Sequence, residues 1–363
     1  MLVRAAAAHA PSLMPGDHHY PTVIRLGRIG DMIAVTALLA LLHERFGRPC
    51  NLIGAGPWNE AIFLAHPDVA RLWSFARNKP MLLSAAAPSA LWALRRSSPA
   101  PIYVCEHQAK PLARVRQFLT LGCIDSRRCA FISDEPRGAP ENWVDRQLQL
   151  GARTPPAAQS LEAADVPANR VYAPRIPLLE EERTACAALI RDRGWAGRDL
   201  ILIQPGNYRS MSRGSTPSDD KAWPLERWVE LLRRLHEHLP QAILVLLGYG
   251  REIEVLRQLE VAAALPTAEV IELPLRELFA LCEHAHSMIS VDTGPAHAAA
   301  AFGIPLVVLY GAESSAAWLP RSAGSPVMGL GGPPRSTRVA EISVETVFAA
   351  WCSQTPKAVA ASA

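Results

Sequence analysis

The chain has few cysteines and no long hydrophobic run, and each of these absences excludes a class of protein. Its seven cysteines are scattered, odd in number and without a C-x-x-C pair. This usage indicates free thiols in a reducing compartment and argues against a disulfide framework or a zinc site. No apolar run approaches the roughly 18 residues that a membrane-spanning helix needs. The sequence therefore predicts a cytoplasmic protein.

A strong excess of charge of either sign is also missing. The net charge is +3, and the sequence contains no RNP, zinc-finger or basic-helix signature, so we expect no nucleic-acid partner. A hydrophobic content of 49% with 20% charged residues is typical of a globular protein. A length of 363 residues fits two domains of medium size.

The two ends of the chain lack a periodic pattern. We expect residues 1–21 to form a flexible tail rather than a signal peptide, because the apolar part of Met1–Ala10 is short and His9 interrupts it. The small and polar residues at 354–363 predict a disordered tail.

The most informative segment is Ser290–His297. An apolar run at 285–291 predicts a buried strand, 298–303 a short helix ended by glycine, and 304–311 a second buried strand. A helix that begins at the carboxyl end of such a strand points free N–H groups at a ligand, and phosphate suits that position. Gly294 permits close approach, while Asp292 can bind hydroxyls and His297 can donate to an anion. A capped turn that binds nothing is the alternative.

Strand and helix patterns alternate in both halves, which predicts an α/β fold with parallel sheets. The connection between the halves is the segment 151–178, rich in Ala, Pro and Arg. Strands are predicted at 23–26, 51–53, 102–105, 200–204, 242–248 and 270–272, and helices at 31–46, 58–65, 111–121, 180–194, 225–239, 251–264, 275–282 and 342–351.

Three segments carry a resemblance to a known family. DTGPAHAAAAFGIPLVVLYG, residues 292–311, resembles the donor-site signature of glycosyltransferase family 9, the bacterial ADP-heptose:lipopolysaccharide heptosyltransferases. Ile24–Ile33 is similar to the Gly-Asp loop of that family, and Asp219–Trp228 to its Lys-x-Trp-Pro segment. Three motifs in this order and spacing are specific to the family, although not to one member's substrate. The resemblance covers roughly residues 22–350.

The resemblance implies the GT-B architecture, in which two Rossmann-like, doubly wound domains face a central cleft. The acceptor-binding domain would span residues 22–165 and carry the catalytic base, and the nucleotide-sugar-binding domain would span 175–340. The segment 151–178 would act as the hinge for closure of the cleft. The helix at 341–353 would follow, and in this architecture such a helix often packs back on the first domain.

The resemblance also implies an inverting, metal-independent enzyme with no cofactor. It would move heptose from ADP-heptose to a hydroxyl of a lipopolysaccharide core or a related glycan, with contact to the inner membrane through the acceptor. An alternative is a family 9 transferase with another nucleotide sugar, or with a protein or secondary-metabolite acceptor. A second alternative is a non-catalytic module that binds sugar nucleotides.

Two residues are the catalytic candidates. Asp31 matches the catalytic aspartate of the family and would take the proton of the acceptor hydroxyl, although an aspartate at this point could also only cap the helix that follows. Lys221 matches the lysine that binds the diphosphate, where its ammonium would stabilise the departing ADP. The alternative for Lys221 is a solvated lysine before a helix.

The remaining candidates fall into two groups. For the donor, Glu252 matches the position that binds ribose hydroxyls, with a helix-start glutamate as the alternative. The loop 207–218 is longer and more basic than in the heptosyltransferases, and Ala312–Ser315 replaces an expected Pro-Thr-Asp-like turn. The other donor candidates are Thr216, Asp292, Thr293, Gly294 and His297, with possible loop contacts from Asn207, Arg209 and Arg213.

Candidates for the acceptor are Arg28, His107 and Lys110, with a surface histidine or a solvated basic face as the alternative.

Overall fold

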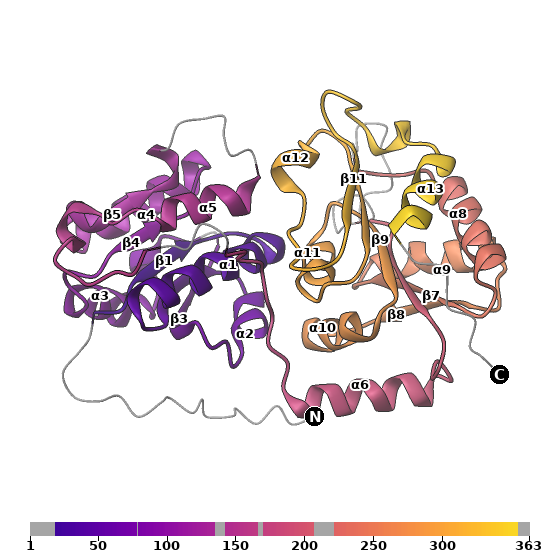
Figure 1. Cartoon of the computed structure of the whole chain (residues 1–363), viewed down its shortest axis with the longest axis horizontal. Helices are drawn as coiled ribbons and strands as arrows, with labels where there is room; N and C mark the ends of the chain where they lie inside the picture. Colours follow the sequence, from indigo (N-terminus) through magenta and orange to yellow (C-terminus); the bar gives the residue numbers. More distant parts are fainter. Residues whose placement is uncertain (1–18, 78, 135–141, 166–169, 207–220, 355–363) are drawn as a thin grey trace.

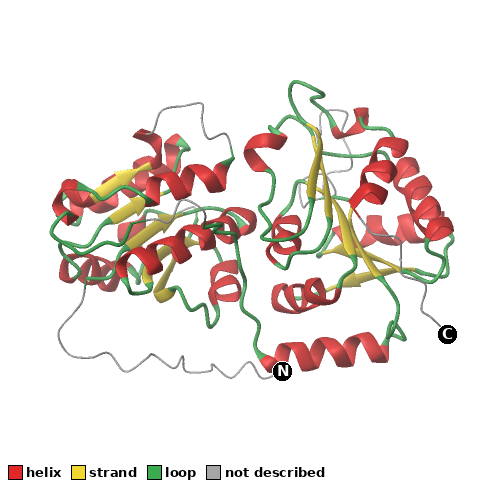
Figure 2. Ribbon diagram, in the orientation of Figure 1, coloured by secondary structure: helices red, strands yellow, loops and turns green. Residues whose placement is uncertain are grey.

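Two α/β units, each built around a parallel sheet, make up the protein (Figures 1 and 2). The computed structural model describes residues 19–77, 79–134, 142–165, 170–206 and 221–354. The first unit comprises the strands up to residue 131, and the second those from residue 200 onward. The expected tails at 1–21 and 354–363 lie almost entirely outside the described residues.

The sheet of the first unit has the strand order β3-β2-β1-β4-β5, with every adjacent pair parallel. The order reverses between β1 and β4, so the crevice beyond their carboxyl ends is the expected ligand site of this sheet. The strands are β1 Thr22–Arg25, β2 Cys50–Ala55, β3 Val69–Phe75, β4 Ile102–Val104 and β5 Cys129–Phe131. The helices are α1 Ile29–Phe46, α2 Trp58–Phe63, α3 Ala87–Arg96, α4 Ala109–Leu121 and α5 Trp143–Gly151, with 3₁₀ turns at Met81–Leu83, Ser126–Arg128, Ile132–Asp134 and Pro156–Ala158.

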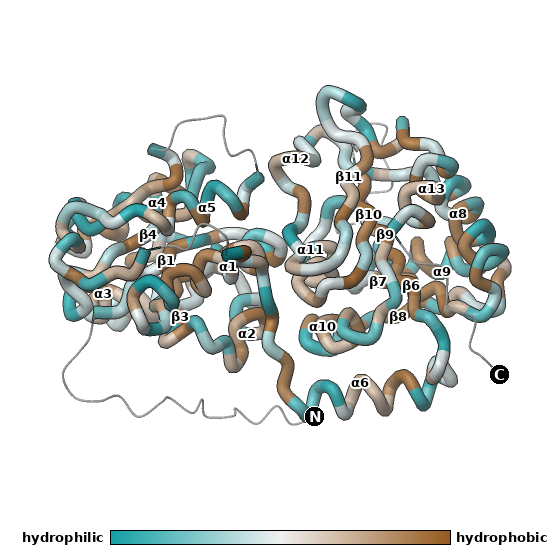
Figure 3. Tube along the Cα trace, in the orientation of Figure 1, coloured by the Kyte–Doolittle hydropathy of each residue, from teal (hydrophilic) through white to brown (hydrophobic). Residues whose placement is uncertain are grey.

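The sheet of the second unit has the order β11-β10-β9-β6-β7-β8, again with parallel pairs, and its order reverses between β6 and β9. Hydrophobic residues follow its central strands, and hydrophilic ones recur along the outer helices (Figure 3). The strands are β6 Leu200–Gln204, β7 Ile243–Gly248, β8 Ala268–Glu272, β9 Ser287–Val291, β10 Leu306–Tyr310 and β11 Val327–Gly331. The helices are α6 Glu180–Asp192, α8 Leu225–His238, α9 Glu252–Ala263, α10 Leu275–His284, α11 Gly294–Ala301, α12 Ser315–Trp318 and α13 Val344–Gln354, with a 3₁₀ turn at Val339–Glu341.

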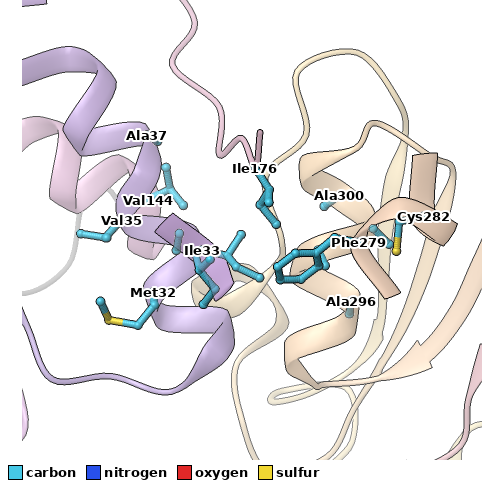
Figure 4. Packing of buried hydrophobic residues seen from close by; sticks show 14 of the residues in the cluster. Met32, Ile33, Val35, Ala37, Val144, Ile176, Phe279, Cys282, Ala296 and Ala300 are labelled. Atoms are coloured by element: carbon cyan, nitrogen blue, oxygen red, sulfur yellow. The ribbon is translucent and has the colours of Figure 1, made fainter. Parts of the chain in front are cut away.

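Helix α1 joins the two units through a shared apolar core. It is buried along most of its length, as expected of a helix that is apolar nearly all round. One face covers the first sheet, and the amino-terminal half packs against α11 of the second unit. Ile33 points toward Phe279 of α10, and both side chains are fully buried (Figure 4). This buried contact is part of the core that holds the two units together.

Helix α1 begins at Ile29, ahead of the predicted start at Asp31. Its first turn contains Gly30 and the polar Asp31, which hide the helical period. Helix α11 begins at Gly294 and so includes the glycine turn ahead of the apolar run at 298–303.

The final helix packs differently from the expectation. Helix α13 lies against α8 and β10 of the second unit, rather than against the first domain. Trp351 is buried there, and its indole Nε1 donates to the Ser287 hydroxyl at 2.9 Å. The apolar face of α13 covers the second sheet, which leaves it no apolar stripe for the other unit.

The connection between the units is attached to the first one. The backbone N–H of Arg175 donates to the Thr36 hydroxyl of α1 at 3.0 Å. The Arg175 guanidinium binds the buried Asp68 carboxylate at 2.6 Å, and the Asp68 carboxylate also contacts His43 at 2.7 Å. The segment before α6 thus follows the surface of the first unit until about residue 176. The expected hinge at 151–178 and the exact domain limits stay predictions.

Candidate active site

The amino-terminal ends of α1 and α11 meet where the two crevices face each other. A Cβ on Gly30 would lie 2.6 Å from Cδ2 of His297, and a Cβ on Gly294 would lie 2.8 Å from Cβ of Ile29. Real Cβ atoms do not approach other atoms so closely, so these two glycines permit the contact. Asp31 of the first unit and His297 of the second are brought together as a result.

Asp31 is held by a buried arginine from the preceding strand. The Arg25 Nη2 donates to Asp31 Oδ1 at 2.5 Å, and Nη1 donates to the Cys105 carbonyl at 2.7 Å. The backbone N–H of Arg28 donates to Asp31 Oδ2 at 2.8 Å. A planar guanidinium with several donors can fix a carboxylate in one orientation. Each Asp31 oxygen keeps accepting capacity, and the side chain remains 21% exposed.

The arrangement at Asp31 includes a helix cap but is more than a cap. Arg28 is the residue before α1, and Asp31, the third residue of the helix, accepts from its N–H as in a capping box. The ion pair with Arg25 has no part in capping. Asp31 therefore caps α1, as the alternative predicted, and it also presents a fixed, partly exposed carboxylate.

Glu106 completes the charge arrangement at the switch point of the first sheet. It follows β4, is buried, and accepts from the backbone N–H of Leu26. Its other oxygen lies 3.4 Å from Arg25 Nη1. Arg25 is thus shared by two carboxylates, Glu106 on the inner side and Asp31 on the side of the second unit.

Opposing effects set the pKa values of the two carboxyls. Burial alone would raise the pKa of Asp31, but Arg25, the Arg28 N–H and His297 together hold it below its usual value. Burial raises the pKa of Glu106, and Arg25 only partly offsets the effect. Asp31 is therefore ionised at neutral pH, the state that a general base requires.

The second unit contributes a lysine and an aspartate at the carboxyl ends of its strands. Lys221 Nζ lies 2.5 Å from Asp292 Oδ2, and both side chains are partly exposed. Asp292 follows β9, and Thr293 precedes α11 as its N-cap residue and shares a 3.0 Å hydrogen bond with the Ser290 hydroxyl. The site thus combines an ammonium group with the free N–H groups of a helix start, which suits a diphosphate.

His297 connects the two halves of the site. Burial lowers its pKa, and the nearby Asp292 and Asp31 act in the opposite direction without cancelling it. The imidazole is therefore neutral at neutral pH, with one N–H to donate. Its ring packs against Gly30 of α1, the residue before Asp31, while Asp292 directly follows β9 of its own unit.

Glu252 lies at the same edge of the second sheet. It is the first residue of α9, is buried, and accepts from the backbone N–H of Tyr249 at 2.9 Å. Burial raises its pKa, while that N–H and Gln204 act to lower it. The bonds with its own helix start fit the helix-start alternative, and its place beyond β7 fits the ribose role.

A cluster of aromatic rings closes the other side of the site. His107, after β4, packs on Trp143 of α5 with ring centroids 4.5 Å apart. Trp143 stacks on Trp318 of α12 at 5.5 Å, with 28° between the planes. Burial lowers the pKa of His107 to about 4, and Arg25 and Arg146 add to the effect. A small cavity of about 30 Å³ remains, lined by Gly30, Asp31, Ala34, Asn142, Trp143, Val144, His297, Ala317, Trp318 and Leu319.

Comparison with known proteins identifies the family of this chain. The model of glycosyltransferase family 9 (heptosyltransferase) matches residues 136–345. The chain belongs to glycosyltransferase family 9. A relative described as lipopolysaccharide heptosyltransferase 3 of Escherichia coli is 27% identical over 133 residues, which span 36% of this chain and 36% of that protein.

Solved structures of family 9 share the fold. A family 9 glycosyltransferase from Veillonella parvula superposes with a TM-score of 0.68 at 16% identity, covering 93% of this chain and 98% of its own. The E. coli ADP-heptose lipopolysaccharide heptosyltransferase II gives 0.64 at 18% identity, with 91% and 97% covered. The E. coli heptosyltransferase WaaC with ADP gives 0.62 at 16%, with 90% and 97% covered. These matches confirm the predicted GT-B fold, and the family match confirms a glycosyltransferase.

The structure divides the site residues predicted from the sequence into three sets. The structure brings together Asp31, Lys221, Asp292, Thr293, Gly294, His297 and His107 around the contact of the units, with Glu252 at the same sheet edge. Arg28 and Lys110 are exposed, at the start of α1 and in the first turn of α4. Thr216, Asn207, Arg209 and Arg213 lie outside the described residues.

Sequence reasoning missed four residues of the site. Arg25 ends an apolar strand and Glu106 follows one, and a charge at a buried strand end is the signal that points to them. Trp143 and Trp318 lie in helices of nine and four residues that the sequence analysis did not predict, so nothing singled them out. By contrast, Trp223 and Trp228 are buried in the core of the second unit.

Within the described part of the chain, no helix is both long and apolar enough to cross a membrane.

Proposed function

We propose that the protein transfers heptose from ADP-heptose to a hydroxyl of a lipopolysaccharide core or a related glycan. One observation carries the proposal. The α11 residue His297 packs against Gly30, next to Asp31, and Lys221 and Asp292 lie at the same edge of the second sheet, so a carboxylate and a cationic group approach one point from opposite units. Family membership supports the sugar class, since the matched family model is described as heptosyltransferase.

The reaction is a single displacement with inversion. The acceptor oxygen loses its proton to an Asp31 oxygen and forms a bond to the anomeric carbon. The bond from that carbon to the β-phosphate oxygen breaks, and ADP leaves with the electron pair. Arg25 keeps Asp31 ionised and oriented, and Asp31 protonates only as the acceptor oxygen attacks.

Groups of the second unit balance the charge on the leaving ADP. Lys221 exchanges its partner Asp292 for the diphosphate, and the N–H groups at the start of α11 face the same oxygens. Neutral His297 donates a hydrogen bond there, and Glu252 accepts from a ribose hydroxyl. These protein charges support the metal-independent mechanism that we propose, and addition of a chelator to the assay tests it.

A second candidate keeps the fold and changes the substrates. The loop 207–218 is longer and more basic than in the heptosyltransferases, and Ala312–Ser315 departs from the family pattern. These departures favour another nucleotide sugar, or a protein or secondary-metabolite acceptor. The paired presence of Asp31 and Lys221 argues against a non-catalytic binding module.

The deciding experiment measures ADP release from ADP-heptose, with and without a lipopolysaccharide core acceptor. Release that depends on the core acceptor supports the proposal. Release with ADP-heptose but with a different acceptor supports the second candidate. Binding of ADP-heptose without release under any condition supports the non-catalytic module. We propose that the enzyme works in the cytoplasm and meets the inner membrane through its acceptor.

A further inference from the structure

Trp143 and Trp318 form an aromatic contact between the units beside Asp31. Trp143 is the first residue of α5 in the first unit, and Trp318 the last residue of α12 in the second. Their rings stack at 5.5 Å, and His107 touches both, at 4.5 Å and 5.8 Å. The two indoles line the same small cavity as Asp31 and His297. Whatever reaches Asp31 from this side therefore meets the indole rings.

Polar contacts between the two units accompany the stacked rings. Asn142 caps α5, and its Nδ2 donates across the contact to the carbonyls of Ala316 at 3.3 Å and Leu319 at 3.1 Å. Arg321 and Asp145 form an ion pair that also joins the two units. Because Trp143 and Trp318 belong to different units, the two rings separate when the units move apart.

Two buried polar atoms in the aromatic cluster have no hydrogen-bond partner among the described residues. They are Trp143 Nε1 and His107 Nδ1. Trp143 is only 6% exposed, so water does not satisfy its N–H freely. Leaving such groups unpaired costs roughly 1–3 kcal/mol each. A ligand hydroxyl at the ring edge would satisfy them.

The closed contact has no room for a sugar. The cavity of about 30 Å³ holds a water molecule or two, whereas small-molecule sites measure some hundreds of Å³. A sugar ring that enters this cavity to reach Asp31 has to displace Trp318 from Trp143. This displacement exposes a flat aromatic face with an N–H donor and a neutral imidazole at its edge.

We propose that the Trp143 indole is the platform on which the acceptor sugar ring stacks, and that Trp318 covers this platform until the acceptor arrives. The inference rests on the proposed function, because it assigns the acceptor subsite of that reaction. A pyranose packs its C–H groups on an aromatic face with dispersion and quadrupole attraction, and Trp143 Nε1 and His107 Nδ1 bond its hydroxyls.

The platform serves the acceptor rather than the donor because of where Trp143 lies. It belongs to the unit that carries Asp31, the group that takes the acceptor's proton. The diphosphate site at Lys221 and α11 belongs to the other unit. Arg25 lies 5.3 Å from the Trp143 ring centroid and binds Asp31, so the indole and the base share one support.

The test compares Trp143→Ala and Trp143→Phe with Trp92→Ala as the matched control. Trp92 is a 55% exposed tryptophan on α3 of the same unit, away from the contact. Calorimetric titration with lipopolysaccharide core oligosaccharide, in the presence of ADP, measures acceptor affinity without turnover. We expect affinity about tenfold weaker in Trp143→Ala and a smaller loss in Trp143→Phe, which keeps a flat ring. ADP affinity should not change, and Trp92→Ala should match the wild type.

Trp318→Ala should not weaken acceptor binding as Trp143→Ala does, because the Trp318 ring covers the platform and competes with the acceptor. We expect its acceptor affinity to equal or exceed that of the wild type. A tenfold loss in Trp318→Ala, or equal acceptor affinity in Trp143→Ala and wild type, overturns the platform. Oligosaccharide binding without heptose transfer by the wild type rejects the proposed function alone. No oligosaccharide binding by the wild type rejects both. Trp143→Phe keeps the test valid if Trp143→Ala does not fold.

Discussion

Arg25 and Asp31 form an ion pair of 2.5 Å between the end of the central strand and the first turn of α1. The arginine is 3% exposed, so its charge acts on the carboxylate through a poorly solvated medium. It also binds the carbonyl of Cys105, the residue after the neighbouring strand β4. The switch point of the first sheet therefore both positions the candidate base and keeps it ionised.

Asp31→Asn should abolish transfer while leaving fold and ADP affinity intact. The amide keeps the size of the side chain and accepts from the Arg28 N–H, but it cannot take a proton. A general base contributes on the order of 10²–10⁴-fold, so kcat should fall by that factor. Steady-state kinetics and ADP titration measure both effects. If the variant keeps more than about a tenth of the wild-type kcat, Asp31 only caps α1.

Arg25→Gln should shift the acid limb of the pH profile to higher pH. The pKa of Asp31 lies below its usual value because Arg25 outweighs burial. Without the guanidinium, burial raises this pKa, so the base becomes protonated at a higher pH and activity is lost earlier as pH falls. Arg25→Lys keeps the charge and should shift the limb less. An acid limb at the same pH in all three proteins would show that Arg25 does not act through Asp31.

Lys221→Ala should weaken ADP binding by about 10- to 100-fold, because a charge-assisted bond to phosphate contributes roughly 1.5–3 kcal/mol. Turnover should fall as well, since the departing ADP loses its counter-charge. Arg209→Ala and Arg213→Ala should have smaller effects. Calorimetry with ADP measures all three. Unchanged affinity in Lys221→Ala, together with a loss in Arg213→Ala, would assign the diphosphate to the long loop.

Gly294→Ala should impair closure of the two units. The added Cβ would lie 2.8 Å from Cβ and Cγ2 of Ile29, and neither atom is the free end of a long side chain. We expect a drop in kcat/KM that Ile29→Gly, which removes both clashing atoms, partly restores in the double variant. Gly324→Ala is the control, because nothing lies within 4 Å of its Cβ position. A defect that Ile29→Gly does not relieve would place the effect within α11 or on the donor.

Much of the fold was predictable because strand and helix patterns are local. The strand at 200–204 was predicted at its exact limits, and Leu225–His238 differs from its prediction by one residue at the end. Strands β3, β5 and β11 were missed. Their residues are mostly half-buried, so their hydrophobic pattern is weak. The resemblance to family 9 supplied the arrangement of two domains, which periodicity alone does not provide.

Within the candidate site, the sequence by itself identified the turns. A glycine-containing turn at the end of an apolar strand has exposed N–H groups wherever the fold places it, so Asp31, Asp292 and Gly294 could be singled out from their neighbours. Only the tertiary structure decided which turns meet. Arg25 reaches Asp31 and Glu106 across two parallel strands, and His297 approaches Gly30 over more than 260 residues of chain. Such contacts depend on how the two sheets pack against each other through α1. Local sequence patterns do not encode which residues distant in the chain this packing brings together.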